Sequence, residues 1–292
     1  MRTKIGVVGT PGGWSSEKLA DTVADMTGHR FLIDMGRLSL DMSAGRAWFE
    51  DTDISALDAL IIKKIGAWYS PDLLDRLEML RFLNARGLPI FSSPLNIMRV
   101  LDRLSCTVTL QLAGIPMPPT TVTEDVDAAT SAVARYGEAV FKPLYSTKAK
   151  GMLLLPSGPE ARRTVEAYHN ENPIMYIQKK LDLQGKDLGV AFLGGQYLTT
   201  YARVKGEGAW NTTTRSGGHY EAFDPPHELI DLAHNAQAPF GLDFTCVDVA
   251  ETPDGPIVFE VSAFGGFRGI ETASGIDAAR RYVQFVLERI KS

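Results

Sequence analysis

The sequence predicts a mixed fold that is α/β at its start and α+β in its later part. Short apolar strands alternate with helices over roughly the first ninety residues, which is typical of a small open α/β domain. The last hundred or so residues instead contain hairpins, with predicted turns at Gly194-Gly195 and at 253–255. Between these regions, the proline-rich segment 116–120 is the strongest candidate for a junction.

The first part of the chain alternates strand and helix. A helix is expected from about Ser15, and a second opens at Pro71 and ends at Gly87. The predicted strands span residues 4–10, 30–33, 59–62 and 88–91. This order of elements favours an open sheet with helices packed against it.

The middle and the end of the chain are predicted as follows. A helix begins at Ser93-Pro94 and continues, with a kink or break, to Gly114. A strand is expected directly after the junction, further strands at 139–144, 151–155 and 174–181, and helices near 128–136 and 159–169. The hairpins follow, and an amphipathic helix over 278–290 closes the chain.

Composition excludes several classes of protein. The chain has 292 residues, 45% of them hydrophobic, and a formal charge of −5, so it lacks the basic footprint of a nucleic-acid partner. No apolar run is long enough for a membrane span, and the apolar stretch near the start of the sequence is too short for the core of a signal peptide. Cys106 and Cys246 are expected to be buried small hydrophobes rather than a disulfide or a metal pair. We therefore expect a cytoplasmic protein.

Two carboxylates are predicted to face each other near the C-terminus. Residues 257–263 alternate in the manner of a strand, with Glu260 and Ser262 on one face. If the second hairpin is centred on Asp254, Asp248 lies opposite Glu260, on a face that also carries Val258, Phe244 and Cys246. Like charges so paired repel each other, and a bound Mg²⁺ would resolve the conflict. The alternatives are that the carboxylates face solvent or that Arg268 pairs with them.

A lysine on a strand is the best candidate for a phosphate ligand. The segment "GTPGGWSS" is not a P-loop, because it lacks the Gly-Lys-Ser/Thr ending. In "VFKPLYSTKAKGM", Lys142 lies on a strand and is followed by a loop that carries Lys150. A strand lysine aimed into a cleft binds phosphate well, whereas a solvated lysine on an edge strand is the alternative.

This combination resembles the ATP-grasp superfamily, and within it the RimK-like carboxylate–amine ligases. The most specific match is the long ordered stretch "VDVAETPDGPIVFEVSAFGGFRGIE", against the family's "VDI…EVNASPGLEGIE". Weaker matches are Asp102-Arg103, "GIPMPPT", Lys142-Pro143 and "QKKL" at 178–181. The resemblance covers the whole chain and implies a three-domain ATP-grasp fold. Its parts would be an N-terminal α/β domain over 1–92 and two α+β lobes enclosing the nucleotide, a central one over 93–184 and a C-terminal one with the metal site over 185–292.

The resemblance also implies ATP and Mg²⁺ as cofactors and gives each candidate residue a role. The metal ligands would be Asp248, Glu260 and Ser262. The nucleotide would be held by Arg103, Lys142, Lys150, the adenine hinge Gln178, Lys179, Lys180 and Leu181, the ribose-side acid Asp187, and Asn211. The candidate catalytic cations are Arg203 and Arg215.

The chain departs from the family's pattern mainly where the acid and the acceptor would bind. The family's Asp-Ile-Arg after the hinge is "DLG" here, so Gly189 replaces an arginine. Asn211 stands where an arginine is expected, Thr213 where an asparagine is expected, and Ser262 replaces a metal-binding asparagine. The loop after Lys142 has two lysines in place of a glycine- and serine-rich sequence. The resemblance therefore does not support glutamate as the substrate.

The resemblance implies a ligase that uses ATP and Mg²⁺ to activate a carboxylate as an acyl phosphate, which an amine or thiol then attacks. The expected partners are small-molecule or peptide carboxylates and amines, with no nucleic acid and no membrane, and a homo-oligomer is an open alternative. Two other functions stay open, namely a small-molecule kinase with the same nucleotide site and a nucleotide-binding regulatory module. The chain is also similar to a bacterial group of ATP-grasp proteins known from gene neighbourhoods, the GAK system, for which the resemblance supplies no substrate.

Overall fold

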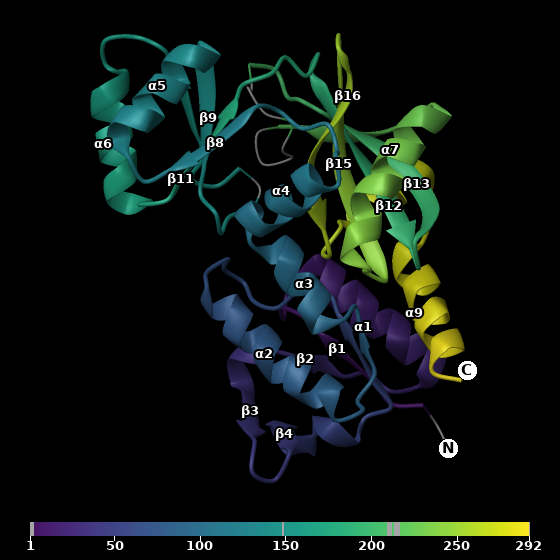
Figure 1. Ribbon diagram of the computed structural model, residues 1–292. Helices are drawn as coiled ribbons and strands as arrows, with labels where there is room; N and C mark the ends of the chain where they lie inside the picture. The colour runs from purple at the N-terminus through teal and green to yellow at the C-terminus, as the bar shows by residue number, and fades with distance from the viewer. Residues whose placement is uncertain (1–2, 148, 209–211, 213–216, 292) are drawn as a thin grey trace.

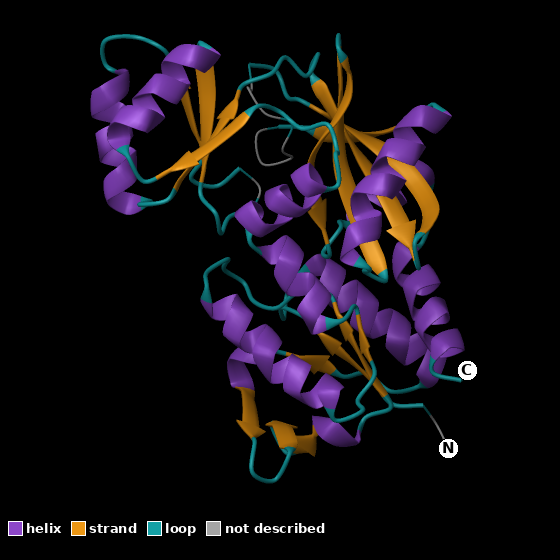
Figure 2. Cartoon of the chain, in the orientation of Figure 1, coloured by secondary structure: helices purple, strands orange, loops and turns teal. Residues whose placement is uncertain are grey.

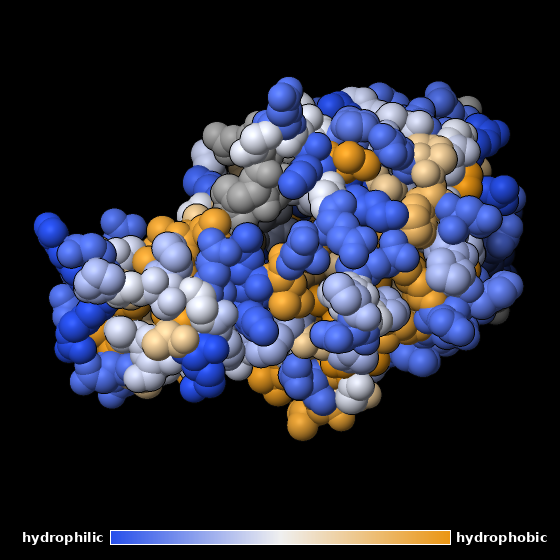
Figure 3. All heavy atoms as spheres, turned by 90° about the horizontal axis from the view of Figure 1, so that it is seen from above, coloured by the Kyte–Doolittle hydropathy of each residue, from blue (hydrophilic) through white to orange (hydrophobic). Residues whose placement is uncertain are grey.

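The structure is a computed structural model of the chain, and it describes residues 3–147, 149–208, 212 and 217–291. A larger body contains the N-terminal and C-terminal elements, and a smaller one, which carries α5 and α6, projects to one side (Figure 1). Figure 3, a view from above, shows the smaller body projecting sideways from the larger one. The predicted mixture of α/β and α+β regions is confirmed.

A parallel four-stranded sheet forms the N-terminal part, in the order β2-β1-β6-β7 (Figure 2). Its elements are β1 (Ile5–Val8), α1 (Trp14–Thr27), β2 (Leu32–Ile33), β6 (Ala59–Ile62), α2 (Asp72–Ala85) and β7 (Ile90–Phe91). Every residue of β1 and β6 is buried, as expected for parallel strands covered on both faces. The four strands predicted for this region are present, although β1, β2 and β7 are shorter than expected.

A small antiparallel sheet, which the sequence analysis does not predict, extends this part in the order β3-β4-β5. Its strands are β3 (Leu38–Asp41), β4 (Arg46–Phe49) and β5 (Thr52–Asp53), flanked by 3₁₀ turns at Met35–Arg37 and Ile54–Ala56. In β4, Ala47 and Phe49 are buried while Arg46 and Trp48 are exposed, so the strand has one face on the core.

The predicted helix from Ser93 to Gly114 is broken, as expected, and the break has a clear cause. It consists of α3 (Pro94–Leu101) and α4 (Arg103–Leu112), with Asp102 in an extended conformation between them. The Asp102 side chain accepts hydrogen bonds from the N–H groups of Leu104 and Ser105 and so caps α4. The cap makes Arg103 the first residue of α4.

The projecting central lobe has its own antiparallel sheet in the order β10-β9-β11-β8. Its elements are β8 (Thr120–Thr123), α5 (Val126–Tyr136), β9 (Glu138–Lys142), β10 (Leu153–Pro156), α6 (Ala161–Glu171) and β11 (Met175–Lys179). The two helices pack with the sheet around a separate core that includes Ala132, Phe141 and Val165. Because β9 is an inner strand, Lys142 is not the solvated edge lysine that the sequence left open as an alternative.

The C-terminal part is a five-stranded antiparallel sheet in the order β14-β13-β12-β15-β16. Its elements are β12 (Lys186–Leu193), β13 (Gln196–Val204), β14 (His219–Ala222), α7 (His227–Gln237), a 3₁₀ turn at Ala238–Phe240, β15 (Phe244–Thr252), β16 (Gly255–Ser262), α8 (Phe267–Ser274) and α9 (Ala278–Arg289). Both predicted hairpins are present. The side chains of α7 pack on one face of the sheet, and those of α8 and α9 pack on the other.

The second hairpin differs from the prediction in its register. Near the turn, Thr252 pairs with Gly255 and Val249 with Val258, whereas Asp248 pairs with Glu260, so Phe259 is an extra residue in a β-bulge. Val258 therefore packs in the core with Val249. The unbroken alternation had instead suggested that Val258 shares the face of the carboxylates. The predicted pairing of Asp248 with Glu260 is nevertheless confirmed, because the bulge restores it.

The N-terminal sheet and the C-terminal sheet share hydrophobic cores. One cluster joins Val7 and Leu19 to Phe244 and Tyr282. A buried lysine, Lys63, crosses the same boundary: its Nζ donates to the carbonyl oxygen of Gly265 at 2.5 Å and lies 3.6 Å from the centre of the Phe267 ring. Burial lowers the pKa of Lys63 well below its ordinary value.

Cys106 and Cys246 are buried and free, as the sequence predicts. Among the helices of the described ranges, none is long and apolar enough to cross a membrane.

Candidate active site

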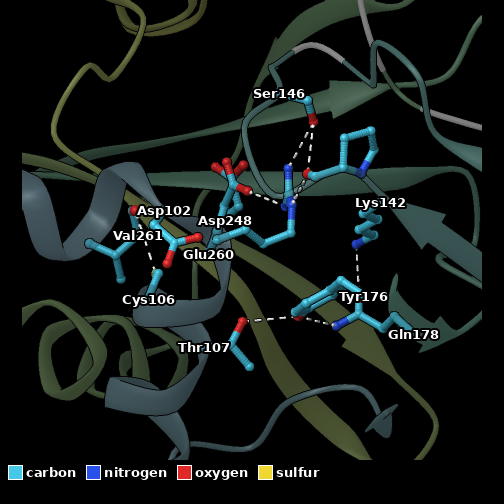
Figure 4. Close-up of polar contacts among 12 residues, drawn as sticks. Asp102, Cys106, Thr107, Lys142, Ser146, Tyr176, Gln178, Asp248, Glu260 and Val261 are labelled. Carbon is cyan, nitrogen blue, oxygen red and sulfur yellow. Dashed lines mark hydrogen bonds and ion pairs between the residues drawn. The ribbon is translucent and has the colours of Figure 1, made fainter. Parts of the chain in front are cut away.

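The candidate site lies where the central lobe meets the C-terminal sheet, and it is centred on two opposed carboxylates (Figure 4). Asp248 on β15 is directly opposite Glu260 on β16. The Asp248 side chain is 20% exposed and that of Glu260 is 41% exposed. Burial raises the pKa of the Asp248 carboxyl to about 7, while Arg203 lowers this pKa and the neighbouring charges of Glu260 and Asp187 raise it.

Two arginines partly neutralise these carboxylates. The Nη1 of Arg103 lies 2.9 Å from the Oε2 of Glu260, and the Nη2 of Arg203 lies 3.0 Å from the Oδ1 of Asp248. Arg203 also forms an ion pair with Asp187, which is opposite it on β12. Arg268, the partner considered from the sequence, instead lies over the ring of Trp14 at 4.8 Å.

The donor set fits a Mg²⁺ ion that arrives with a nucleotide. Asp248 and Glu260 offer hard carboxylate oxygens, and protein Mg²⁺ sites commonly use one or two carboxylates together with substrate phosphates. In the described ranges, no three His, Cys, Asp or Glu side chains form a cage of their own. The third predicted ligand, Ser262, is on the same strand, and its Oγ accepts a hydrogen bond from the N–H of Phe264 at 3.1 Å. The residues therefore suit a shared metal–phosphate site.

Lys142 reaches the site from the end of β9. Its Nζ donates to the Oε1 of Gln178 and lies 5.0 Å from the centre of the Phe259 ring. Burial and the positive charge of Arg103 together lower the pKa of Lys142 to about 7, against the opposing effect of Glu260 and Asp248. An incoming phosphate would provide a negative counter-charge for the Lys142 ammonium.

Arg103 is held to the loop that follows Lys142. Its Nε donates to the carbonyl oxygen of Pro143 at 3.2 Å and its Nη2 to the Oγ of Ser146 at 3.3 Å. Since the Arg103 side chain is only 9% exposed, these contacts and Glu260 fix its direction. The two predicted phosphate ligands, Arg103 and Lys142, are therefore brought together.

The predicted adenine hinge is at the end of β11. The N–H groups of Lys179 and Lys180 already donate to the carbonyl oxygens of Pro119 and Glu138, at 2.8 and 3.0 Å. The N–H of Leu181 donates to no backbone carbonyl in the described part of the chain, so it is the donor left for a base. The side chain of Gln178 is buried, with 1% of the residue exposed. Adenine recognition at this hinge stays a prediction.

The remaining predicted residues are placed less centrally. Asp187 is buried and paired with Arg203, and its contact with a ribose stays a prediction. The Nζ of Lys150 lies 4.4 Å from the centre of the Trp68 ring, toward the N-terminal part. Asn211 and Arg215 lie outside the described residues.

Sequence reasoning missed the residues that support Lys142. Tyr176 is two residues before Gln178 on β11, so both side chains lie on one face, and its hydroxyl is 2.9 Å from the Oγ1 of Thr107 on α4. The period-two spacing of Tyr176 and Gln178 is a signal that could have linked them. No local signal connects Thr107 with a strand 69 residues away.

Comparison with known proteins places this chain in a family. A model of the RimK-like ATP-grasp domain matches residues 100–286. The tetrahydromethanopterin:alpha-L-glutamate ligase of Methanosarcina acetivorans is 25% identical, over 97% of this chain and 98% of that protein.

Two solved structures share the fold. The RimK domain ATP-grasp protein of Sphaerobacter thermophilus has a TM-score of 0.76 and 20% identity, over 97% of this chain and 99% of that one. The ATP-grasp ligase PsnB, in complex with a phosphomimetic variant of its minimal precursor, Mg and ADP, has a TM-score of 0.77 and 18% identity, over 99% of both chains.

The fold and the site define an ATP-grasp enzyme, with a lysine and an arginine set against paired carboxylates. The chain belongs to the RimK-like ATP-grasp family, and it is a ligase of the ATP-grasp type.

Proposed function

We propose that the protein uses ATP and Mg²⁺ to join a carboxylate to an amine, or to a thiol, through an acyl phosphate. One observation carries this proposal. Lys142 on β9 and Arg103 on α4 converge on the paired carboxylates of the C-terminal sheet, Asp248 and Glu260. Such an arrangement offers positive charge for phosphates and hard carboxylate oxygens that would suit Mg²⁺. The acceptor would be a small molecule or a peptide.

The residues of the chain would act mainly by alignment. Asp248 and Glu260 would hold Mg²⁺, which supplies neutralisation of the phosphate charge. Arg103 would exchange Glu260 for phosphate oxygens, and Lys142 would contact the same group. The acid's carboxylate oxygen would bond to the γ-phosphorus as the bond to the leaving ADP oxygen breaks. The amine would then displace inorganic phosphate from the acyl carbon and release a proton. Alignment and charge stabilisation suffice for this chemistry.

Nucleotide binding is the first test. Calorimetry with ATP and Mg²⁺ is expected to show binding, and Lys142→Met is expected to weaken it about tenfold because one charge-assisted contact to phosphate is lost. Lys4→Met changes an exposed lysine far from the site and serves as the matched control. Absence of binding to the folded wild type at millimolar ATP would remove the proposed function.

The products then separate the ligase reading from its alternatives. Pooled carboxylic acids and amines are added with ATP and Mg²⁺, ADP release is followed, and the products are examined by mass spectrometry. An amide mass supports the ligase, whereas a phosphate ester would indicate a kinase. Binding without ADP release from any pool would favour a nucleotide-binding regulatory module.

Glutamate is expected to be a poor acid substrate, although the Methanosarcina acetivorans relative is named for it. Asn211 lacks the charge and the fork of donors of an arginine, and the Ser262 hydroxyl already accepts from Phe264. Losing one charge-assisted contact costs about 1.5–3 kcal/mol, which slows turnover roughly ten- to a hundredfold. The measurement is amide formation from glutamate with a panel of amines. Glutamate transfer appearing only in Asn211→Arg with Ser262→Asn supports this expectation, and efficient transfer by the wild type contradicts it.

A further inference from the structure

We propose that Gln178 is a positioning residue that orients Lys142 for the nucleotide phosphates, and that its side chain does not bind adenine. This inference rests on the proposed nucleotide site but goes beyond it, because the hinge position alone suggests a contact with the base. The contacts of the Gln178 amide support it step by step.

The hydrogen bonds around Gln178 fix which way its amide points. The Oγ1 of Thr120 donates to the carbonyl oxygen of Pro118 at 2.9 Å, so toward Gln178 this hydroxyl can only accept. The Nε2 of Gln178 donates to Thr120 Oγ1 at 3.1 Å and to the hydroxyl of Tyr176 at 3.3 Å. Both amide hydrogens are used in this way, and Oε1 must face Lys142.

Lys142 needs such an acceptor. An ammonium has three donors and no acceptor, and in the described part of the chain Oε1 of Gln178 is the polar atom that Lys142 Nζ contacts. The Phe259 ring lies on another side of the same Nζ. Together the amide oxygen and the ring set the direction of the lysine, and leave its remaining donors for an anion.

Burial excludes the competing role for the glutamine. Gln178 is 1% exposed and its amide is fully used by protein partners, so a base could reach it only if these bonds broke. Lys142 is more accessible, since it is half-buried at the end of β9. The ligand would therefore meet the lysine and not the glutamine.

The same hydrogen bonds link Lys142 to the helix that carries Arg103, the other predicted phosphate ligand. The hydroxyl of Tyr176 also pairs with Thr107 Oγ1 at 2.9 Å, and Thr107 lies one turn beyond Arg103 on α4. The chain Thr107–Tyr176–Gln178–Lys142 thus holds β9 and β11 against the helix that begins with Arg103 (Figure 4).

A double-mutant cycle tests the inference. Calorimetry measures the affinity for ADP with Mg²⁺ in the wild type, Lys142→Met, Gln178→Met and the double variant. Gln178→Met is expected to weaken binding about tenfold when Lys142 is present and by less than about twofold when it is methionine. An equal loss in both backgrounds means that Gln178 contacts the nucleotide directly and overturns the inference. No loss in either background overturns it as well. If the wild type itself does not bind, the proposed function fails and this inference with it.

Two further variants guard against a purely structural effect. Tyr176→Phe removes the hydroxyl that accepts from the amide, and it is expected to weaken binding about threefold, again only when Lys142 is present. It provides the same cycle if Gln178→Met does not fold. Gln111→Met makes the same chemical change at an exposed position of α4 and should leave affinity unchanged. Variants that lower the melting temperature but keep wild-type affinity contradict the positioning role.

Discussion

Asp248→Asn is expected to abolish turnover and yet to stabilise the metal-free protein above pH 7. The variant removes a carboxylate proposed to hold Mg²⁺, and turnover should fall at least about a hundredfold. The stability gain follows from the pKa of Asp248, which burial raises to about 7. The native state therefore binds a proton between about pH 4 and 7 that the unfolded chain has lost, so the free energy of unfolding falls as pH rises through this window. Asparagine does not titrate, so the variant escapes this loss of stability. Its free energy of unfolding at pH 8 should be higher by on the order of 2 kcal/mol.

Urea unfolding of both proteins at pH 5 and at pH 8 measures this effect. Glu260→Gln is the matched control, and its stability should change in the opposite direction. Arg103 is only 9% exposed, and it would lose the carboxylate that neutralises it. Equal losses of stability in the two variants at pH 8 would contradict the expectation and would indicate that both carboxylates belong to one structural ion-pair network.

Arg203→Met is expected to have the largest effect on stability of any single change in the site. Arg203 lies between Asp187 and Asp248, and the side chains of all three are at most 20% exposed. Its removal leaves the Asp187 carboxylate in a poorly solvated place without a counter-charge, while Asp248, whose pKa Arg203 lowers, shifts toward its neutral form. Breaking such a buried pair typically costs about 3–5 kcal/mol. Chemical denaturation at pH 7 measures the loss, and turnover should fall with it.

Two further variants separate the effect of the Arg203 charge from the effect of its packing. Arg203→Lys keeps the charge, but a single ammonium cannot bridge both carboxylates as the guanidinium does, so it should recover only part of the loss. Adding Asp187→Asn to Arg203→Met should recover another part, because the carboxylate left without a counter-charge is removed. A loss below about 1 kcal/mol in Arg203→Met would show that water reaches these carboxylates freely.

Local patterns were enough to predict most of the fold. Fully apolar runs such as Ile5–Val8 and Ala59–Ile62 predict buried strands, and Pro94 predicts a helix start. A break in that helix was expected, but its position at Asp102 was not. The β3-β4-β5 sheet was missed because its strands are only two to four residues long. The bulge at Phe259 was missed because the sequence 257–263 alternates without interruption, and the extra residue is revealed only by its pairing with β15.

The candidate site could be predicted in part. The pairing of Asp248 with Glu260 follows from the hairpin, and Lys142 follows from its strand and the Lys-Pro dipeptide. Arg103 and Glu260, which form an ion pair, are 157 residues apart in the chain, and no periodicity connects them. The same holds for Lys63 and Gly265, 202 residues apart. Contacts that depend on how separate sheets are packed cannot be read from the sequence along one strand.

The bulge in β16 has a consequence for how this hairpin can vary among genes. Since Phe259 is the one unpaired residue between Val258 and Glu260, losing its codon would leave a regular ladder in which Glu260 still meets Asp248 and Val258 still meets Val249. A frame-preserving deletion here would keep both acids in place and remove only the ring beside Lys142. The hairpin can thus gain or lose an aromatic neighbour for the lysine in one genetic step, without passing through a form in which the acids are misaligned.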